Sequence, residues 1–230
     1  MHIMIYNEDC LDAMKRMESK CFDLSIVDPP YGLKMGTDHW ACQHGKPSPT
    51  WKGRRQMGYT PKDWDNERPS QEYFDELQRV SRFQVIWGGN HFADMLPPSG
   101  GWIVWDKVVA LPTLSKCELA WTNAMGRVEM VKLLWSGYKK CEPVKRIHPT
   151  QKPIALYEYV FSLLAKPNWK ILDTHLGSGS SAIAAHNMGM NLDFVGYEID
   201  KEFHEKSLER IERHKSQLQL FSNSRNSILF

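Results

Sequence analysis

The sequence DLSIVDPPY, residues 23–31, is the stretch on which the fold depends, because it joins a strand to a rigid turn. Residues 22–27 form an apolar run of strand type. Pro29 and Pro30 must end this strand, since proline has no N–H for a sheet ladder and restricts the residue before it. Asp28 is therefore expected at the carboxyl end of a buried strand, the edge of an α/β sheet where ligands bind. The simpler alternative is a strand that ends in a Pro-Pro turn with Asp28 as a cap.

Length and composition limit the class of protein. A chain of 230 residues fits one domain, and we expect a single domain over residues 1–230. The net charge of +2 is nearly neutral, so any attraction to a polyanion must come from local basic stretches. Five cysteines without paired spacing argue for a reducing compartment, and no apolar run approaches membrane-spanning length. We expect a cytoplasmic protein without a membrane partner, bacterial or encoded by a phage.

The spacing of apolar residues predicts strands and helices that follow one another along the chain, as in an α/β protein. Strands are expected at 3–6, 22–27, 83–87, 102–105, 118–122, 127–135, 170–173 and 192–198, and helices at 10–17, 70–82, 153–164, 179–188 and 200–220. Asp9 is positioned to cap the first helix. The strands at 118–122 and 127–135 are expected to form an antiparallel pair.

A second candidate site follows the strand at 170–173, where a glycine turn leads into a helix. Gly177, Ser178 and Gly179 let the backbone approach a ligand closely, and the helix start suits a polar or anionic group. Glu198 follows Gly177 by 21 residues, at the end of the next strand, where an acid can bind ribose hydroxyls. The pattern predicts a nucleoside-cofactor pocket, against the alternative of a tight strand-to-helix connection without a ligand.

The glycine pattern also fits an NAD-dependent oxidoreductase, but its place in the chain argues against that class. Only one further strand is expected after the turn, whereas a cofactor loop at a switch point needs sheet on both sides. The other strands must come from upstream. This places the Asp28 strand beside the cofactor strand, and Asp28 and Tyr31 next to the nucleoside pocket.

Three motifs in order carry a resemblance. DPPY at 28–31, HPTQKP at 148–153 and DTHLGSG at 173–179 resemble the β group of amino-methylating DNA methyltransferases, in which the catalytic motif precedes the cofactor motif. The resemblance covers nearly the whole chain. It implies a seven-stranded Rossmann-like sheet, mostly parallel with an antiparallel strand, that binds S-adenosyl-L-methionine. It also implies methyl transfer to the N6 amino group of adenine in DNA, or less often to N4 of cytosine, in a restriction-modification setting.

The resemblance implies a catalytic role for Asp28, Pro29, Pro30 and Tyr31. Asp28 and the Pro29 carbonyl would accept the two amino hydrogens of the target base and orient its lone pair toward the methyl donor. Tyr31 would stack on the base, which must leave the duplex to reach the pocket. The transfer would be direct and in line, so that no cysteine nucleophile is required.

The cofactor residues implied by the resemblance come from four parts of the chain. They are Asp9 near the cofactor adenine, Thr150, Gln151 and Lys152 over the methionine carboxylate, Asp173 with Gly177, Ser178 and Gly179 at the turn, and Glu198 at the ribose. The family usually has Pro-Phe where this chain has Thr174 and His175. His175 would therefore either contact the cofactor or replace the missing ring, and we favour the replacement.

The expected macromolecular partner is double-stranded DNA. Residues 32–69 are rich in Lys, Arg and Trp and are expected to form a mobile, DNA-facing loop. Residues 106–147 are expected to contain target recognition. Asn90 and His91 would line the base pocket or cap a helix. A zinc site at His39, Cys42 and His44 lacks a matching second pair, so no metal is expected.

Several alternatives stay open at this stage. A single-stranded or RNA substrate, a catalytically inactive nucleic-acid binder and a homodimer are each compatible with the sequence. The motifs identify no partner restriction endonuclease.

Overall fold

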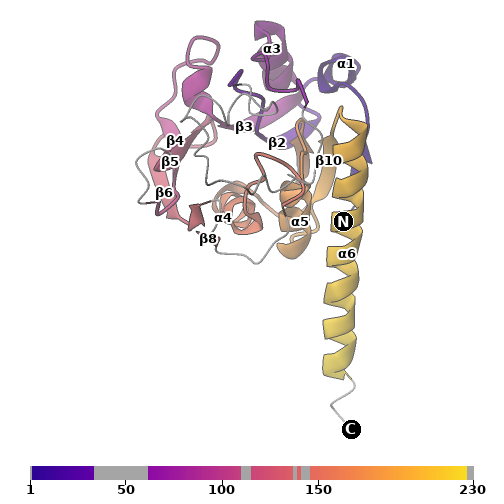
Figure 1. Cartoon of the computed structure of the whole chain (residues 1–230). Coiled ribbons are helices and arrows are strands. Elements are labelled where there is room, and N and C mark those ends of the chain that lie inside the picture. Colours follow the sequence, from indigo (N-terminus) through magenta and orange to yellow (C-terminus); the bar gives the residue numbers. More distant parts are fainter. Residues whose placement is uncertain (1, 34–61, 110–114, 137–138, 141–145, 227–230) are drawn as a thin grey trace, which may run out of the picture.

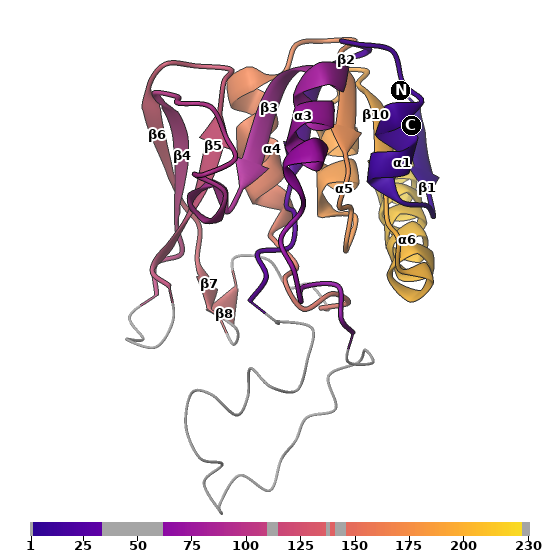
Figure 2. The same cartoon turned by 90° about the horizontal axis from the view of Figure 1, so that it is seen from above.

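The computed structural model describes residues 2–33, 62–109, 115–136, 139–140 and 146–226. Its main sheet has eight strands in the order β1-β10-β9-β2-β3-β5-β4-β6, which Figure 2 shows from β6 at one edge to β1 at the other. The strands are β1 (Ile3–Tyr6), β2 (Phe22–Val27), β3 (Ser81–Trp87), β4 (Gly101–Asp106), β5 (Cys117–Thr122), β6 (Val128–Lys132), β9 (Lys170–Asp173) and β10 (Asp193–Tyr197). All neighbouring pairs are parallel except the two made by β5. A short antiparallel pair, β7 (Trp135–Ser136) and β8 (Lys139–Lys140), lies apart from the sheet.

Helices cover both faces of the sheet (Figure 1). Helices α1 (Cys10–Lys15) and α3 (Gln71–Val80) lie on one face, and α4 (Ile154–Leu164) and α5 (Ser180–Asn187) lie on the other. Helix α6 (Lys201–Asn226) begins beside β10 and extends past the body of the protein. A single 3-10 turn, η1 (Gly89–His91), follows β3. The result is a three-layer α/β arrangement.

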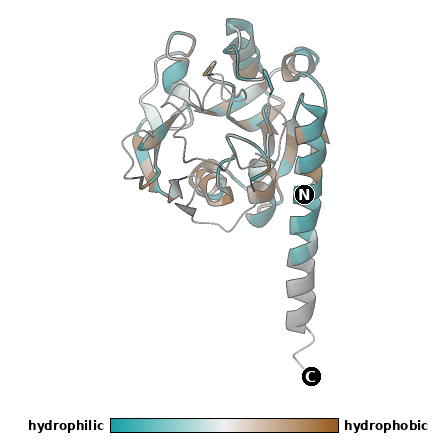
Figure 3. Cartoon of the chain, viewed as in Figure 1, coloured by the Kyte–Doolittle hydropathy of each residue, from teal (hydrophilic) through white to brown (hydrophobic). Residues whose placement is uncertain are grey.

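Two cores fill the spaces between the layers. Leu24, Val85 and Ile171 point toward α4 and α5, whereas Ile86 and Leu172 point toward α1 and α3. Successive residues of a strand therefore point into opposite cores, because side chains alternate between the two faces of a sheet. Figure 3 shows the same pattern, with hydrophobic residues in the strands and in α4 and α5, and hydrophilic residues along the described part of α6.

Capping residues explain where several helices start. The Asp9 side chain accepts hydrogen bonds from the N–H groups of Leu11 and Asp12, at 2.8 and 3.1 Å, which confirms the predicted cap of α1. Ser70 caps α3 through the N–H of Tyr73. Pro153 lies at the N-cap of α4 and not inside its first turn as expected.

The central topological prediction is confirmed. Strand β2 pairs in parallel with β9, with Leu24 opposite Ile171 and Ser25 opposite Leu172, so Asp28 and Asp173 end neighbouring strands. The chain also has the expected mostly parallel α/β sheet with one antiparallel strand, β5.

Two expectations about the sheet are wrong. The strands near 118–122 and 127–135 do not pair with each other, because β4 lies between them and β6 pairs in parallel with β4. Strand β6 adds an eighth strand where the resemblance implied seven. The periodicity of the sequence could not show that β4 lies between β5 and β6, because a short connection between two strands favours a hairpin and the sheet instead uses a crossover.

None of the helices in the described residues has both the length and the apolar composition needed to span a membrane.

Substitution of the glycine at the start of β4 tests how closely this part of the sheet is packed. A Cβ at Gly101 would lie 2.2 Å from the Met125 carbonyl oxygen and 2.5 Å from that of Thr122, both backbone atoms. We expect Gly101→Ala to lower the free energy of unfolding by about 2–3 kcal/mol, measured by urea denaturation. Gly126→Ala is the matched control, because nothing lies within 4 Å of its added Cβ. Equal stability of the two variants would contradict the packing described here.

Candidate active site

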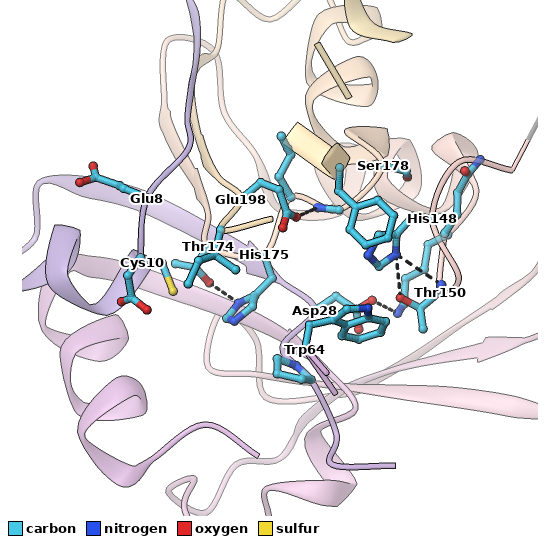
Figure 4. A pocket seen from close by; sticks show the side chains of 18 of the residues that line it. Glu8, Cys10, Asp28, Trp64, His148, Thr150, Thr174, His175, Ser178 and Glu198 are labelled. Carbon is cyan, nitrogen blue, oxygen red and sulfur yellow. Dashed lines mark hydrogen bonds and ion pairs between the residues drawn. The ribbon is translucent and has the colours of Figure 1, made fainter. Parts of the chain in front are cut away.

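One cavity of about 320 Å³ lies where β2 and β9 end and joins the two predicted motifs. The predicted residues that line it are Asp9, Asp28, Pro30, Thr150, Gln151, Lys152, His175, Gly177, Ser178 and Glu198. Pro29, Tyr31, Asp173 and Gly179 are not among its lining residues. Figure 4 shows Glu8 and Cys10 at the end opposite His148 and Thr150, with Glu198, Thr174 and His175 between them.

Asp28 is held by two donors at the end of β2. The Tyr31 hydroxyl donates to its Oδ1 at 2.6 Å, and the Lys152 ammonium donates to its Oδ2. Burial raises the pKa of Asp28, and the positive charge of Lys152 opposes that rise. The two carboxylates beside Lys152, Asp28 and Glu118, outweigh its own burial and raise the pKa of the ammonium. A buried cation thus accompanies the carboxylate predicted to be catalytic.

Lys152 was expected at the methionine carboxylate of a cofactor. It lines the cavity, but its Nζ is directed to Asp28 and lies 3.3 Å from Oε2 of Glu118. The neighbouring Gln151 side chain is 3% exposed, and its Nε2 has no hydrogen-bond partner among the described residues. Gln151 therefore offers a buried donor in the wall of the cavity.

The Tyr31 ring, predicted to stack on a target base, packs against other residues of the protein. Its ring stacks on His91, with centroids 4.8 Å apart and planes 16° from parallel. Gly88 has φ +69°, and a Cβ there would lie 2.2 Å from Cε1 of Tyr31, so only glycine fits. His91, expected to line the base pocket or to cap a helix, lies in the η1 turn with its ring on Tyr31, and Asn90 is exposed.

The glycine turn is tied to the acid on the next strand. Gly177 and Gly179 have φ of +54° and +73°, the left-handed region that favours glycine. The Gly177 N–H donates to Oε2 of Glu198 at 2.9 Å, and the Asp200 N–H donates to Oε1 at 2.9 Å. Burial raises the pKa of Glu198 to about 7. The predicted turn and acid therefore form one unit.

Helix α6 supports this turn through a residue that sequence analysis did not identify. Arg210 is 8% exposed, and its Nη1 donates to the Ser178 carbonyl at 2.7 Å and to the hydroxyls of Ser178 and Ser180. Its place in a charged amphipathic helix resembled that of any surface cation. No local pattern distinguished it.

Asp173 lies beneath the turn rather than in the cavity. Its Oδ1 accepts from the N–H of His175 at 3.0 Å, and its Oδ2 accepts from the hydroxyl of Ser181. Burial is the main cause that raises the pKa of Asp173 to about 7. Its contacts stabilise the strand-to-helix connection, and its predicted role as a cofactor ligand stays a prediction.

The His175 ring packs on an aromatic neighbour and also lines the cavity, and its contact with a cofactor stays a prediction. Its ring packs edge to face on Tyr73 at 5.3 Å, as an aromatic replacement would, and the ring also lines the cavity. The Tyr73 hydroxyl bonds to Thr174 Oγ1 at 2.7 Å. Burial lowers the pKa of His175 to about 4, so the imidazole is neutral near pH 7.

Three rings that sequence analysis did not assign to the site form one wall of the cavity. His148 packs against Phe203 with centroids 4.4 Å apart and against Trp64 at 5.1 Å. A Cβ on Gly177 would lie 3.5 Å from Nδ1 of His148. Burial lowers the pKa of His148 to about 3. The position of His148 in HPTQKP was a signal for it, and Trp64 belongs to the Trp-rich segment expected to face DNA, whereas Phe203 had no signal.

No metal site is found in the described part of the chain, where no group of three His, Cys, Asp or Glu side chains could hold an ion. His39, Cys42 and His44 lie outside the described residues. Residues 34–61 of the expected DNA-facing loop also lie outside them.

The raised pKa of Asp173 predicts a pH dependence of stability. Its ionisation costs the folded state more than the unfolded state, so wild type loses this contribution as the pH rises from about 4 to about 7. Asp173→Asn removes the ionisation. Relative to wild type, the variant's free energy of unfolding should therefore rise by roughly 2 kcal/mol between about pH 5 and about pH 8. Urea titrations of both proteins measure this, and contributions of His148 and His175 cancel in the difference because neither is coupled to Asp173. A difference that does not vary with pH would contradict the assignment.

Comparisons with known proteins agree with this architecture. The N6_N4_Mtase family model, described as DNA methylase, matches residues 104–209. The type II methyltransferase M.ScaI of Streptomyces caespitosus is 23% identical over 257 residues, which cover 94% of this chain and 83% of that protein.

Two solved structures have the same fold. The M1.HpyAVI–SAM complex has a TM-score of 0.57 at 20% identity and covers 91% of this chain and 98% of that one. PvuII DNA methyltransferase, described as cytosine-N4-specific, has a TM-score of 0.58 at 12% identity and covers 94% and 92%. The family match and the relative, with the three motifs in their order and the cavity that joins them, support the N6/N4 DNA methyltransferase family for this chain.

Proposed function

We propose that this protein transfers a methyl group from S-adenosyl-L-methionine to the N6 amino group of adenine in double-stranded DNA. The observation that carries the proposal is that Asp28, the glycine turn and Glu198 line one cavity together. The acid at position 28 supports adenine, since a leading acid is typical of the adenine-methylating proteins that the motifs resemble. The solved structure of M1.HpyAVI in complex with SAM supports the cofactor.

The residues of the cavity fit this cofactor. Glu198 can accept from ribose hydroxyls, because each carboxylate oxygen has a second lone pair beyond the one used by the backbone N–H groups. The unpartnered Nε2 of Gln151 can donate to a carboxylate, and Gly177 leaves room that a Cβ would fill. Asp9 lies farther along the cavity, where we propose that it faces the cofactor adenine. When bound, S-adenosyl-L-methionine supplies an electrophilic methyl group on a sulfonium centre.

Asp28 prepares the amino group for reaction. An exocyclic amino nitrogen is a poor nucleophile because its lone pair is delocalised into the ring. A carboxylate oxygen of Asp28 that accepts an N–H hydrogen bond, with the Pro29 carbonyl accepting the second, favours the pyramidal form. The low exposure of Asp28 strengthens this interaction. The same carboxylate is placed to take up the proton that the amino group releases.

We propose that DNA contacts come from residues 32–69 and 106–147. Two described cations of the first segment have other partners: Lys62 pairs with Asp200 and Glu202, at 2.6 and 3.2 Å, and Arg68 pairs with Asp94 at 3.0 Å. These pairs anchor the end of the segment beside the cavity, where Trp64 lines the wall. Phosphate contacts are then expected from the remaining basic residues of these segments.

The catalytic role of Asp28 is tested by Asp28→Ala and the isosteric Asp28→Asn. We expect either change to lower kcat by at least about 100-fold, because the amino group loses its charged acceptor. Methyl transfer from labelled cofactor to duplex DNA measures the rate. Asp75→Asn, on the exposed face of α3, is the matched control and should keep wild-type activity. Full activity in Asp28→Ala would end the proposal.

The identity of the methylated base distinguishes methylation at N6 of adenine from methylation at N4 of cytosine. Digestion of the product to nucleosides followed by mass spectrometry should show N6-methyladenine. Detection of N4-methylcytosine would select the alternative specificity. Assays on duplex DNA, single-stranded DNA and RNA with the same readout identify the substrate.

Cofactor binding is tested separately by removing the Glu198 carboxylate. We expect Glu198→Ala to weaken binding of S-adenosyl-L-methionine by about tenfold or more, since it removes charged hydrogen bonds. Isothermal titration calorimetry measures the Kd, and Glu209→Ala on the exposed side of α6 is the control. Binding of reduced nicotinamide dinucleotide in place of S-adenosyl-L-methionine would instead support an oxidoreductase.

A further inference from the structure

Both carboxylate oxygens of Asp28 accept a hydrogen bond from within the protein. Oδ1 accepts from the Tyr31 hydroxyl, and Oδ2 accepts from the Lys152 ammonium. Each oxygen keeps a second lone pair, but an incoming amino group that uses it must share the carboxylate with the donor already there. A shift of one internal donor would leave the amino group a stronger acceptor.

Lys152 has a second acceptor within reach. Its Nζ lies 3.3 Å from Oε2 of Glu118, and that oxygen is shielded from solvent with no hydrogen-bond partner in the described structure. The other Glu118 oxygen, Oε1, pairs with Lys107. A buried carboxylate oxygen without a donor costs free energy, so a hydrogen bond from Lys152 would relieve that cost.

The topology explains how Glu118 reaches this position. Strand β5 is antiparallel to its neighbours, so its first residues lie at the edge where the parallel strands end. Glu118 stands opposite Trp105, one residue before the end of β4. Asp28, Lys152, Glu118 and Lys107 then alternate in sign and sum to zero charge, as buried ionisable groups require.

Lys152 is confined to a short movement between its two partners. Its Nζ lies 5.8 Å from the ring centroids of both Tyr31 and Trp87. Rings at this distance favour the charged ammonium in either position. The 5% exposure of the Lys152 side chain leaves it little contact with solvent.

We propose that Glu118 is a positioning residue that receives the ammonium of Lys152 when the target amino group enters, which frees Oδ2 of Asp28 to accept the amino hydrogen. This inference rests on the proposed methyl transfer to an amino group. Lys152 stays protonated throughout, and no covalent bond changes in the exchange. Without a base, Lys152 lies closer to Asp28 than to Glu118; with a base bound, it hydrogen-bonds to Glu118.

The exchange is tested by Glu118→Gln in the full-length protein. The amide carries no charge, so Lys152 should stay on Asp28 and kcat should fall about tenfold. The KM for DNA and the Kd for S-adenosyl-L-methionine should stay within about twofold of wild type, because phosphate and cofactor contacts are unchanged. Glu76→Gln, which changes a similarly exposed carboxylate paired with Arg79, is the matched control.

The pH profile separates this role from a purely structural one. Among the described residues, the titratable groups that face Asp28 are Tyr31, Tyr73, Glu118, Lys152, Tyr157 and Asp173. The negative charge of Glu118 raises the pKa of Asp28, so its removal should shift the acidic limb of kcat to lower pH. Glu118→Asp keeps the charge and should leave that limb in place with a smaller loss of kcat. It also serves as the informative variant should Glu118→Gln not fold.

Each outcome has a defined meaning. Wild-type kcat and an unshifted acidic limb in Glu118→Gln, in a protein whose wild type methylates DNA, overturn this inference alone. Equal losses in Glu118→Gln and Glu118→Asp without a shift of the limb indicate a structural role and also overturn it. Absence of methyl transfer by the wild type overturns the proposed function and this inference together.

Discussion

Strands β2 and β9 pair in parallel at Leu24 with Ile171 and at Ser25 with Leu172, and this contact places two distant motifs at one sheet edge. Both strands are buried on both faces and end at that edge, Val27 before a proline turn and Asp173 before a glycine turn. A parallel pair needs no local connection, so residues 147 positions apart can lie next to each other. The cavity, the position of Asp28 and the approach of Lys152 all depend on this contact.

The cavity combines two electrostatic environments. At the Asp28 end, four buried or half-buried charges from different elements compensate one another, which favours the ionised form of a carboxylate that has little contact with water. At the Glu198 end the carboxylate has backbone N–H donors, and its pKa is raised to about 7 mainly by burial. The neutral imidazoles of His148 and His175 also line the cavity. A site arranged in this way suits a ligand that carries several polar groups.

Much of this arrangement was predictable from local chemistry, and its limits are physical. The proline turn after β2, the cap at Asp9 and the glycine turn with Glu198 each depend on a few adjacent residues, and the number of strands left after residue 179 implied that β2 and β9 are neighbours. Glu118 was not identified, because its position depends on an antiparallel strand inserted between β3 and β4. Arg210 and the stack of Tyr31 on His91 likewise depend on tertiary packing that periodicity does not encode.

The pairing of β1 with β10 has a consequence for synthesis of the chain. Ile3 lies opposite Phe194 in the folded sheet, so β1 finds its neighbour only after the chain has been translated as far as β10. Until then the hydrogen-bonding edges of β1 and of one side of β2 have no partner, and exposed strand edges promote association between nascent chains. The folded protein covers these edges only when β9 has paired with β2 and β10 has paired with β1.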